Sequence, residues 1–292
     1  EDKRALIKSV ALELGYRTPA AKLEAARSKG TIAVVAGDLG NPFYATVTEE
    51  LSRQLTQRSA RMLFHAVPSG QDVDSVMRQV LAYRTDGAIL TSATLSSKLA
   101  NACRQNGIPV VLLNRVQADK GMMAVCCDNY GGARKVAARF LAGARKRIGF
   151  LAGRRDTSTQ LERARGFKDQ LNEAGQGVSL QADGAFDYDI ARAAAEEMFR
   201  ARPAIDALFC ANDLMAIAAL NAARAIGVRV PSDVAIIGFD DIPMAAWEAY
   251  NLTTIRQPVR RMLVQALELI SDVQAREAGD IRILPGEMMI RG

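Results

Sequence analysis

The stretch TIAVVAGDLGNPFY, residues 31–44, runs from an apolar segment through a polar loop into the start of a helix. Residues 31–37 carry no charge and are rich in β-branched side chains, which is typical of a strand buried on both faces. Asn41 and Pro42 favour a helix that begins there, because Asn caps helices and proline has no N–H to leave unpaired at the first position. A buried strand that leads directly into a helix predicts one unit of a parallel α/β sheet.

Outward from this stretch, strand and helix patterns alternate along the whole chain. Apolar runs predict further strands at 60–67, 87–92, 108–114, 122–127, 147–153, 205–211 and 233–239, with a weaker one at 180–185 and extended segments at 252–257, 281–285 and 287–292. Amphipathic periodicity predicts helices at 43–58, 72–84, 95–107, 129–142, 159–174, 187–201, 213–226 and 259–276. The pattern restarts near residue 147 without a flexible linker. The sequence therefore predicts an α/β fold of two Rossmann-like parallel-sheet lobes with a cleft between them.

Composition supports a folded protein with no cofactor or metal. Of the 292 residues, 49% are hydrophobic and 24% charged, which excludes disordered, collagen-like and coiled-coil chains. The sequence lacks the dinucleotide and phosphate-loop glycine motifs, has one histidine and has no Cys-x-x-Cys pair. We therefore expect no enzyme and no metal site. The net charge is +6, and half of that excess lies in residues 1–30, so nucleic acid is a candidate partner.

Other features of the sequence bear on where the protein acts. No apolar run is long enough to span a membrane, and the first residues lack the apolar core of a signal peptide. The cysteines are expected to be buried, reduced thiols, which predicts a cytoplasmic protein; they are Cys103, Cys126, Cys127 and Cys210. The chain does not begin with Met, so we expect it to be trimmed from a longer one.

Polar side chains follow several predicted strands, where α/β proteins bind their ligands. Asn114 and Arg115 follow one strand, Asn212 another, and Asp240 and Asp241 a third. Amides, carboxylates and guanidinium groups suit a polyhydroxylated ligand, and an aromatic ring such as that of Phe43 or Phe186 can cover the apolar face of a sugar.

Structural roles compete with ligand binding at some of these positions. Asn41, Asp128 and Asp213 each precede or begin a predicted helix and could simply cap it. The adjacent carboxylates of Asp240 and Asp241 could instead serve acid–base or Mg²⁺ chemistry, although no third carboxylate supports that alternative.

A set of ordered strings resembles the lactose-repressor (LacI/GalR) family of transcription regulators. The strings are TIAVVAGDLGNPFY, DGAIL, GIPVVLLNR, VCCDNYGGA, KRIGFLAG, ERARGF, FCANDLMAIAAL, VPSDVAIIGFDDIP and LTTIRQP. The segment LGYRTPAA, residues 14–21, is similar to the end of that family's DNA-binding headpiece. The resemblance implies a periplasmic-binding-protein-like core that binds a small effector, a sugar or sugar acid, and alters affinity for operator DNA.

The resemblance also implies the effector-binding residues, position by position. They are Asn41, Phe43, Tyr44, Asn114, Arg115, Arg163, Phe186, Asn212 and Asp240. A slip of register leaves Tyr188 as a competitor of Phe186. The identity of the effector, and whether it induces or corepresses, stay open.

The implied organisation has three parts. Residues 1–30 would end the headpiece and form the hinge, with Leu23 as the side chain that wedges into the DNA minor groove. The helix-turn-helix would precede residue 1. The first lobe would comprise 31–145 plus about 258–276, and the second 146–257 plus 277–292.

The resemblance further implies a homodimer or higher oligomer associated with the bacterial nucleoid, with its interface on the predicted helices 43–58 and 72–84. The alternative is a periplasmic sugar-binding transport receptor of the same fold. The headpiece-like segment and the four cysteines argue against that alternative.

Overall fold

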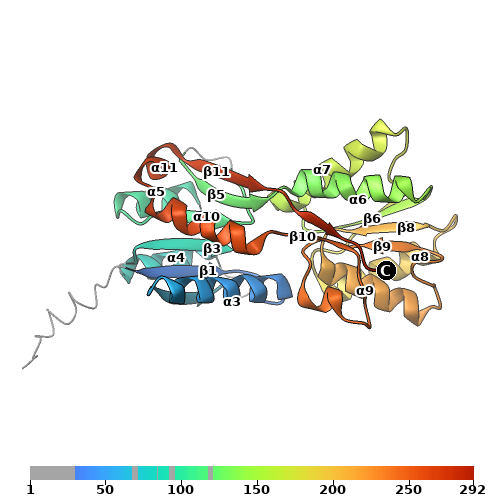
Figure 1. The fold of residues 1–292 in the computed structure, drawn as a ribbon, viewed down its shortest axis with the longest axis horizontal. Helices are drawn as coiled ribbons and strands as arrows, with labels where there is room; N and C mark the ends of the chain where they lie inside the picture. The colour runs from blue at the N-terminus through green and yellow to red at the C-terminus, as the bar shows by residue number, and fades with distance from the viewer. Residues whose placement is uncertain (1–29, 68–71, 84, 92–95, 118–120) are drawn as a thin grey trace, which may run out of the picture.

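The computed structural model describes residues 30–67, 72–83, 85–91, 96–117 and 121–292, which form two lobes lying end to end (Figure 1). The expected headpiece, the hinge and Leu23 lie outside the described residues. Each lobe is built on a sheet of parallel strands. A two-stranded ladder runs between the lobes, where β10 (Thr254–Arg256) pairs antiparallel with β12 (Glu287–Met289).

The first lobe holds a six-stranded sheet in the order β11-β5-β4-β3-β1-β2. Its strands are β1 (Thr31–Ala36), β2 (Arg61–Ala66), β3 (Gly87–Thr91), β4 (Val110–Leu113), β5 (Met123–Cys127) and β11 (Asp280–Leu284). Its helices are α3 (Pro42–Gln57), α4 (Val73–Ala82), α5 (Ser97–Gln105), α10 (Val259–Ser271) and α11 (Val273–Ala278).

Alternation along β1 explains how this sheet buries both faces. Ile32 and Val34 belong to the core that includes α3 and α10, whereas Ala33 and Val35 pack with α4 and α5 on the other face. Successive strand side chains point to opposite faces, so an unbroken apolar strand requires cover on both sides. The prediction that residues 31–37 contain a strand buried on both faces is confirmed in this way.

The second lobe holds a four-stranded parallel sheet in the order β7-β6-β8-β9. Its strands are β6 (Ile148–Ala152), β7 (Leu180–Asp183), β8 (Ala207–Cys210) and β9 (Ala235–Ile237). Its helices are α6 (Asn129–Ala142), α7 (Ser158–Glu173), α8 (Tyr188–Arg200) and α9 (Asp213–Ala225). The rings of Phe150, Phe167 and Phe209 pack together in its core at centroid distances of 4.8–5.6 Å.

Two segments lie in a different lobe from the one predicted. Residues 280–284 were expected in the second lobe, but as β11 they pair in parallel with β5 of the first sheet. Helices α10 and α11 bring the chain to the amino-terminal end of that sheet, so the open edge of β5 is the strand within reach. Residues 129–142 were expected in the first lobe, but α6 packs along α7.

Two details of the helices explain these positions. A Cβ at Gly166 on α7 would come within 2.2 Å of the Tyr130 carbonyl oxygen, so glycine permits the close contact between α6 and α7. The predicted helix 259–276 is interrupted at Asp272, whose extended backbone ends α10 and whose carboxylate caps α11.

Candidate functional site

The carboxyl ends of strands from both sheets face one narrow cleft between the lobes. All nine residues that the sequence indicated line it: Asn41, Phe43, Tyr44, Asn114, Arg115, Arg163, Phe186, Asn212 and Asp240. Asp38 and Thr159 also line the cleft, and the sequence had not indicated them.

The loop after β1 places an amide and two rings on the first-lobe wall. Asn41 is the N-cap of α3, and its Oδ1 accepts a hydrogen bond of 3.0 Å from the Phe43 backbone N–H. Phe43 and Tyr44 follow in the first turn of the helix, with their rings edge to face at 5.3 Å. Asn41 therefore both caps α3 and lines the cleft.

The loop after β4 connects the two lobes directly. Arg115 donates from Nη1 to the Asn114 carbonyl at 2.7 Å and to Thr159 Oγ1, on α7 of the other lobe, at 3.1 Å. The Val116 backbone N–H donates to Ser158 Oγ at 3.0 Å beside it. These contacts join the two lobes beside the cleft.

Arg163 on α7 is the centre of a buried polar network. Its Nε donates to Asn129 Oδ1 at 2.8 Å, its Nη1 to the Ala211 carbonyl, and its Nη2 to Asp240 Oδ1 at 3.2 Å. The guanidinium also lies 3.7 Å from the centroid of the Phe239 ring. Because both charged side chains are almost fully buried, the Arg163–Asp240 pair organises the floor of the cleft as much as it offers groups to a ligand.

Two buried carboxylates interact here, Asp240, which lines the cleft, and Asp213, which does not. Burial raises the pKa of Asp240 to about 6, although the neighbouring Arg163 charge and the Gln257 hydrogen bond of 2.7 Å lower it. Burial also raises the pKa of Asp213 to about 7, with the Asp240 charge adding to the effect. Asp213 accepts hydrogen bonds from Thr254 Oγ1 at 2.5 Å and from the Ile242 backbone N–H at 2.9 Å, and so holds the loop after β9 in place.

The structure decides the competing roles. Asn212 caps α9 through a 3.0 Å bond to the Met215 backbone N–H, so capping by Asp213 is wrong. Asp128 caps α6, as its position suggested. Asp241 forms ion pairs with Arg256 at 2.5 Å and Arg291 at 2.6 Å, and does not line the cleft.

The structure does not support the alternatives of acid–base chemistry or metal binding at Asp240 and Asp241. No group of His, Cys, Asp and Glu suited to a metal ion occurs among the described residues. The adjacent carboxylates of Asp240 and Asp241 are directed to different partners, so they do not form one acid–base pair.

Phe186, not Tyr188, is the aromatic residue of the second-lobe wall. Its ring lies so close to Gly153 that a Cβ there would come within 2.1 Å of it. Tyr188 begins α8, and its hydroxyl accepts a 2.8 Å hydrogen bond from Asn221 instead.

Several residues that line the cleft have unusual backbone conformations. Four residues that line it adopt left-handed φ values although none is glycine: +51° at Asp38, +58° at Asn114, +60° at Phe186 and +127° at Asp240. Such conformations cost roughly 1–3 kcal/mol each and cluster at binding sites, where the surrounding fold imposes them. Four of the nine non-glycine residues with positive φ in the described part of the chain therefore line this cleft.

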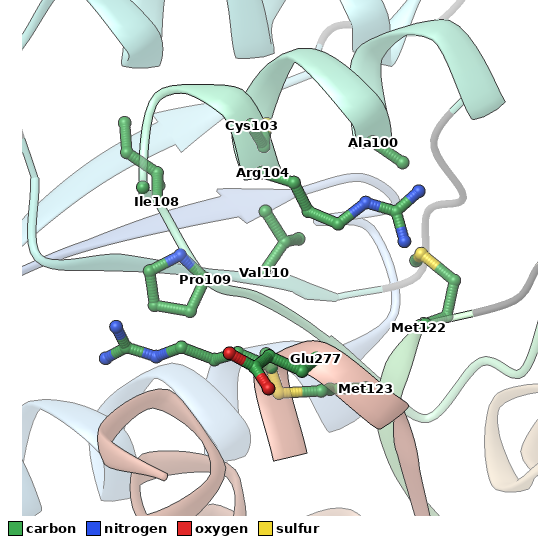
Figure 2. A pocket seen from close by; sticks show the side chains of 12 residues that line it. Ala100, Cys103, Arg104, Ile108, Pro109, Val110, Met122, Met123 and Glu277 are labelled. Carbon is green, nitrogen blue, oxygen red and sulfur yellow. The ribbon is translucent and has the colours of Figure 1, made fainter. Parts of the chain in front are cut away.

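A second, wider pocket lies elsewhere in the first lobe, between α5, β4 and α11 (Figure 2). Val110, Met122 and Met123 form apolar walls, with Arg104 and Glu277 beside them. It lies at the amino-terminal ends of β4 and β5, whereas ligands of open α/β sheets bind at the carboxyl ends. The cleft between the lobes is therefore the candidate site.

Residues 29–281 match the family described as periplasmic binding proteins and sugar binding domain of LacI family. This chain belongs to the LacI family. Among its LacI-type relatives, the transcriptional regulator CelR of Thermobifida fusca is 30% identical over 99% of this chain and 88% of its own length. The regulator DegA of Bacillus subtilis is 29% identical, also over 99% of this chain and 88% of its own length.

Solved structures agree with this assignment. A complex of the transcriptional regulator CelR with cellobiose matches with a TM-score of 0.79 and 28% identity, over 94% of this chain and 91% of that one. A periplasmic solute-binding protein from Actinobacillus succinogenes with D-allose, 19% identical with a TM-score of 0.79, shares the fold alone. The chain is thus a LacI-family transcriptional regulator with an effector-binding core, and the transport-receptor alternative is not favoured. The relatives are regulators and not enzymes, and none of the described helices is long and apolar enough to cross a membrane.

Proposed function

We propose that the cleft binds a sugar-class effector and that its occupancy changes the affinity of the protein for operator DNA. The observation that carries the proposal is the convergence of nine polar and aromatic side chains from both lobes on one strained cleft. Amides, carboxylates and guanidinium groups in this arrangement match the hydroxyls of a sugar, and the rings of Phe43 and Phe186 match its apolar faces. The CelR relative solved with cellobiose supports the same class.

The mechanism follows from the contacts between the lobes. The Arg115–Thr159 and Val116–Ser158 hydrogen bonds span the two lobes, so their separation would open the cleft and a bound effector would add new contacts across it. An effector that binds one arrangement more tightly shifts the lobes toward it, with a coupling free energy of typically 1–3 kcal/mol. Measuring DNA binding with and without the effector determines whether the effector raises or lowers operator affinity.

The test of the binding site compares two aromatic residues. In isothermal titration with a sugar that binds, Phe186→Ala should weaken binding at least tenfold, because it removes a ring from the cleft wall. Tyr188→Ala, only two residues away but outside the cleft, should leave the affinity within about twofold. Equal affinities for the two variants would contradict the assignment.

We extend the proposal to a homodimer of this chain. Ten large apolar side chains are exposed in the described part of the chain, and three of them are aromatic: Tyr83 by 60% at the end of α4, Phe64 by 38% on the edge strand β2, and Trp247 by 56% in the second lobe. A second copy that covers them would bury surface on both lobes. In sedimentation velocity, Tyr83→Asp and Trp247→Asp should shift the protein toward monomer, while Leu161→Asp, equally exposed on α7, should not. A monomeric parent protein would refute the dimer.

DNA binding is tested with any upstream coding sequence restored. Operator affinity should change when the effector is added, and Leu23→Ala should weaken it if Leu23 wedges into the minor groove as proposed. An affinity that no sugar alters would refute the regulatory mechanism. A protein with this role works in the cytoplasm beside the chromosome.

A further inference from the structure

We infer that the effector is a neutral, polyhydroxylated molecule, and that the cleft discriminates against sugar acids and sugar phosphates. This inference rests on the proposed sugar-sensing function and narrows the class of ligand. It comes from three features of the cleft: the partners of its arginines, the carboxylate at its mouth, and two buried polar atoms without partners.

The arginine in the floor of the cleft is not free to bind an anion. Arg163 donates to Asn129, Ala211 and Asp240, and its guanidinium face lies against Phe239. An anionic ligand would have to share Arg163 with Asp240, a buried carboxylate of the same sign. Buried charges of like sign at close range repel strongly, because little solvent screens them.

The second arginine is also compensated. Arg115 is buried and donates to Asn114 and Thr159, and the Asp38 carboxylate lies near it at the exposed mouth of the cleft. Desolvation raises the pKa of Asp38, while the charges of Arg115 and Arg154 act in the opposite direction. The two arginines and two aspartates that line the cleft therefore balance one another.

Two side-chain atoms that line the cleft lack hydrogen-bond partners within the part of the chain that the structure describes. They are Asn114 Oδ1 in the first lobe, an acceptor, and Asn212 Nδ2 in the second, a donor. The orientation of Asn212 is fixed, because its Oδ1 accepts from the Met215 N–H. Buried polar atoms of this kind are normally paired, so they point to groups that a ligand supplies.

Hydroxyl groups fit this arrangement better than anionic oxygens do. A hydroxyl donates and accepts, so vicinal hydroxyls can donate to Asn114 Oδ1 and to Asp240 while accepting from Asn212 Nδ2. A carboxylate or a dianionic phosphate only accepts, so it would leave Asn114 Oδ1 unpaired and would face Asp240. A cationic amino sugar would instead meet Arg115 and Arg163.

The experiment uses pairs of ligands that differ in charge. Isothermal titration of the protein would compare D-glucose with D-gluconate and D-glucose 6-phosphate, D-ribose with D-ribonate, and cellobiose with cellobionate. In every pair that shows binding, the neutral sugar should bind at least tenfold more tightly. Equal or tighter binding of the charged member would overturn this inference and leave the proposed sugar sensing intact. Binding of no member of any set would instead refute the sugar-class effector, and this inference with it.

A pair of substitutions tests the charge argument within the protein. Asp38→Asn leaves Arg115 without its carboxylate, so the ratio of the affinity for the neutral sugar to the affinity for its charged counterpart should fall several-fold. Asp189→Asn is the control, because Asp189 is exposed in the first turn of α8 and does not line the cleft. Identical ligand preference in the two variants would show that Asp38 does not contribute to the discrimination.

Discussion

Replacing Arg163 with methionine should destabilise the protein strongly, because the side chain holds the floor of the cleft together. The substitution removes hydrogen bonds to Asn129, Ala211 and Asp240 and the contact with the Phe239 ring. Methionine keeps most of the apolar volume of the side chain, so the loss of stability reports the contribution of the guanidinium group.

The magnitude follows from the burial of the ion pair. Both side chains are at most 4% exposed, and the Asp240 carboxylate would keep only its bond from Gln257. Removing one partner of a buried pair costs about 3–5 kcal/mol, mainly because the remaining charge is desolvated without compensation. Adding Asp240→Asn should recover about half of that loss, since no charge then remains to be buried.

The loss should also depend on pH. Without Arg163, the pKa of Asp240 would rise further above that of the unfolded chain, and the carboxyl would destabilise the fold only where it is ionised. Stability relative to the parent should therefore recover as the pH falls from 8 to 5.

Urea unfolding followed by circular dichroism and by the single tryptophan, Trp247, measures these differences. Arg165→Met is the matched control, because Arg165 lies on the same helix with 60% of its side chain exposed, and it should change the free energy of unfolding by less than about 1 kcal/mol. A loss below about 1 kcal/mol in Arg163→Met, or a double variant as unstable as the single one, would refute the reasoning.

Three further predictions concern stability, the cleft and the thiols. Burial raises the pKa of Asp213 to about 7 and of Asp240 to about 6, both above 3.8, so the native state binds more protons and the free energy of unfolding should fall as the pH rises from about 4 to 8. A higher urea midpoint at pH 8 than at pH 5 would contradict this. Gly153→Ala should displace Phe186 and weaken effector binding, whereas Gly143→Ala, whose Cβ has ordinary contacts, should not; calorimetry showing equal affinities would exclude that role. The four buried thiols, whose pKa values burial raises, should not react with Ellman's reagent at pH 8 until the protein is unfolded, and immediate labelling would show that they are accessible.

Local sequence patterns predicted the strands and helices well, but they did not predict the lobe to which each one belongs. Apolar runs and caps such as Asp128 act over a few residues, so they can be read directly from the sequence. Membership of β11 in the first sheet depends on its pairing with β5, where Asp280 lies opposite Met123. No local signal encodes a partner so far along the chain.

The candidate site was predictable to a similar extent. The rule that ligands bind at the carboxyl ends of strands, together with the family motifs, indicated nine residues that do line one cleft. Asp38 follows a predicted strand and could have been found by the same rule, whereas Thr159 lies in the first turn of α7 and carried no signal. The role of Asp213 depends on Thr254 and Ile242, which only the folded structure brings to it.

The pairing of β11 with β5 also determines the order in which the protein can be completed during synthesis. Residues 123 and 280 are partners in the sheet, but nearly the whole second lobe lies between them in the sequence. Strand β5 is therefore made long before its partner emerges from the ribosome. Until then β5 is an open edge of the nascent sheet, which neighbouring chains could pair with. Contacts of such long sequence separation slow folding. Neither lobe can therefore be produced alone by cutting the gene once, and an engineered single lobe would need its distant strand joined back by a new loop.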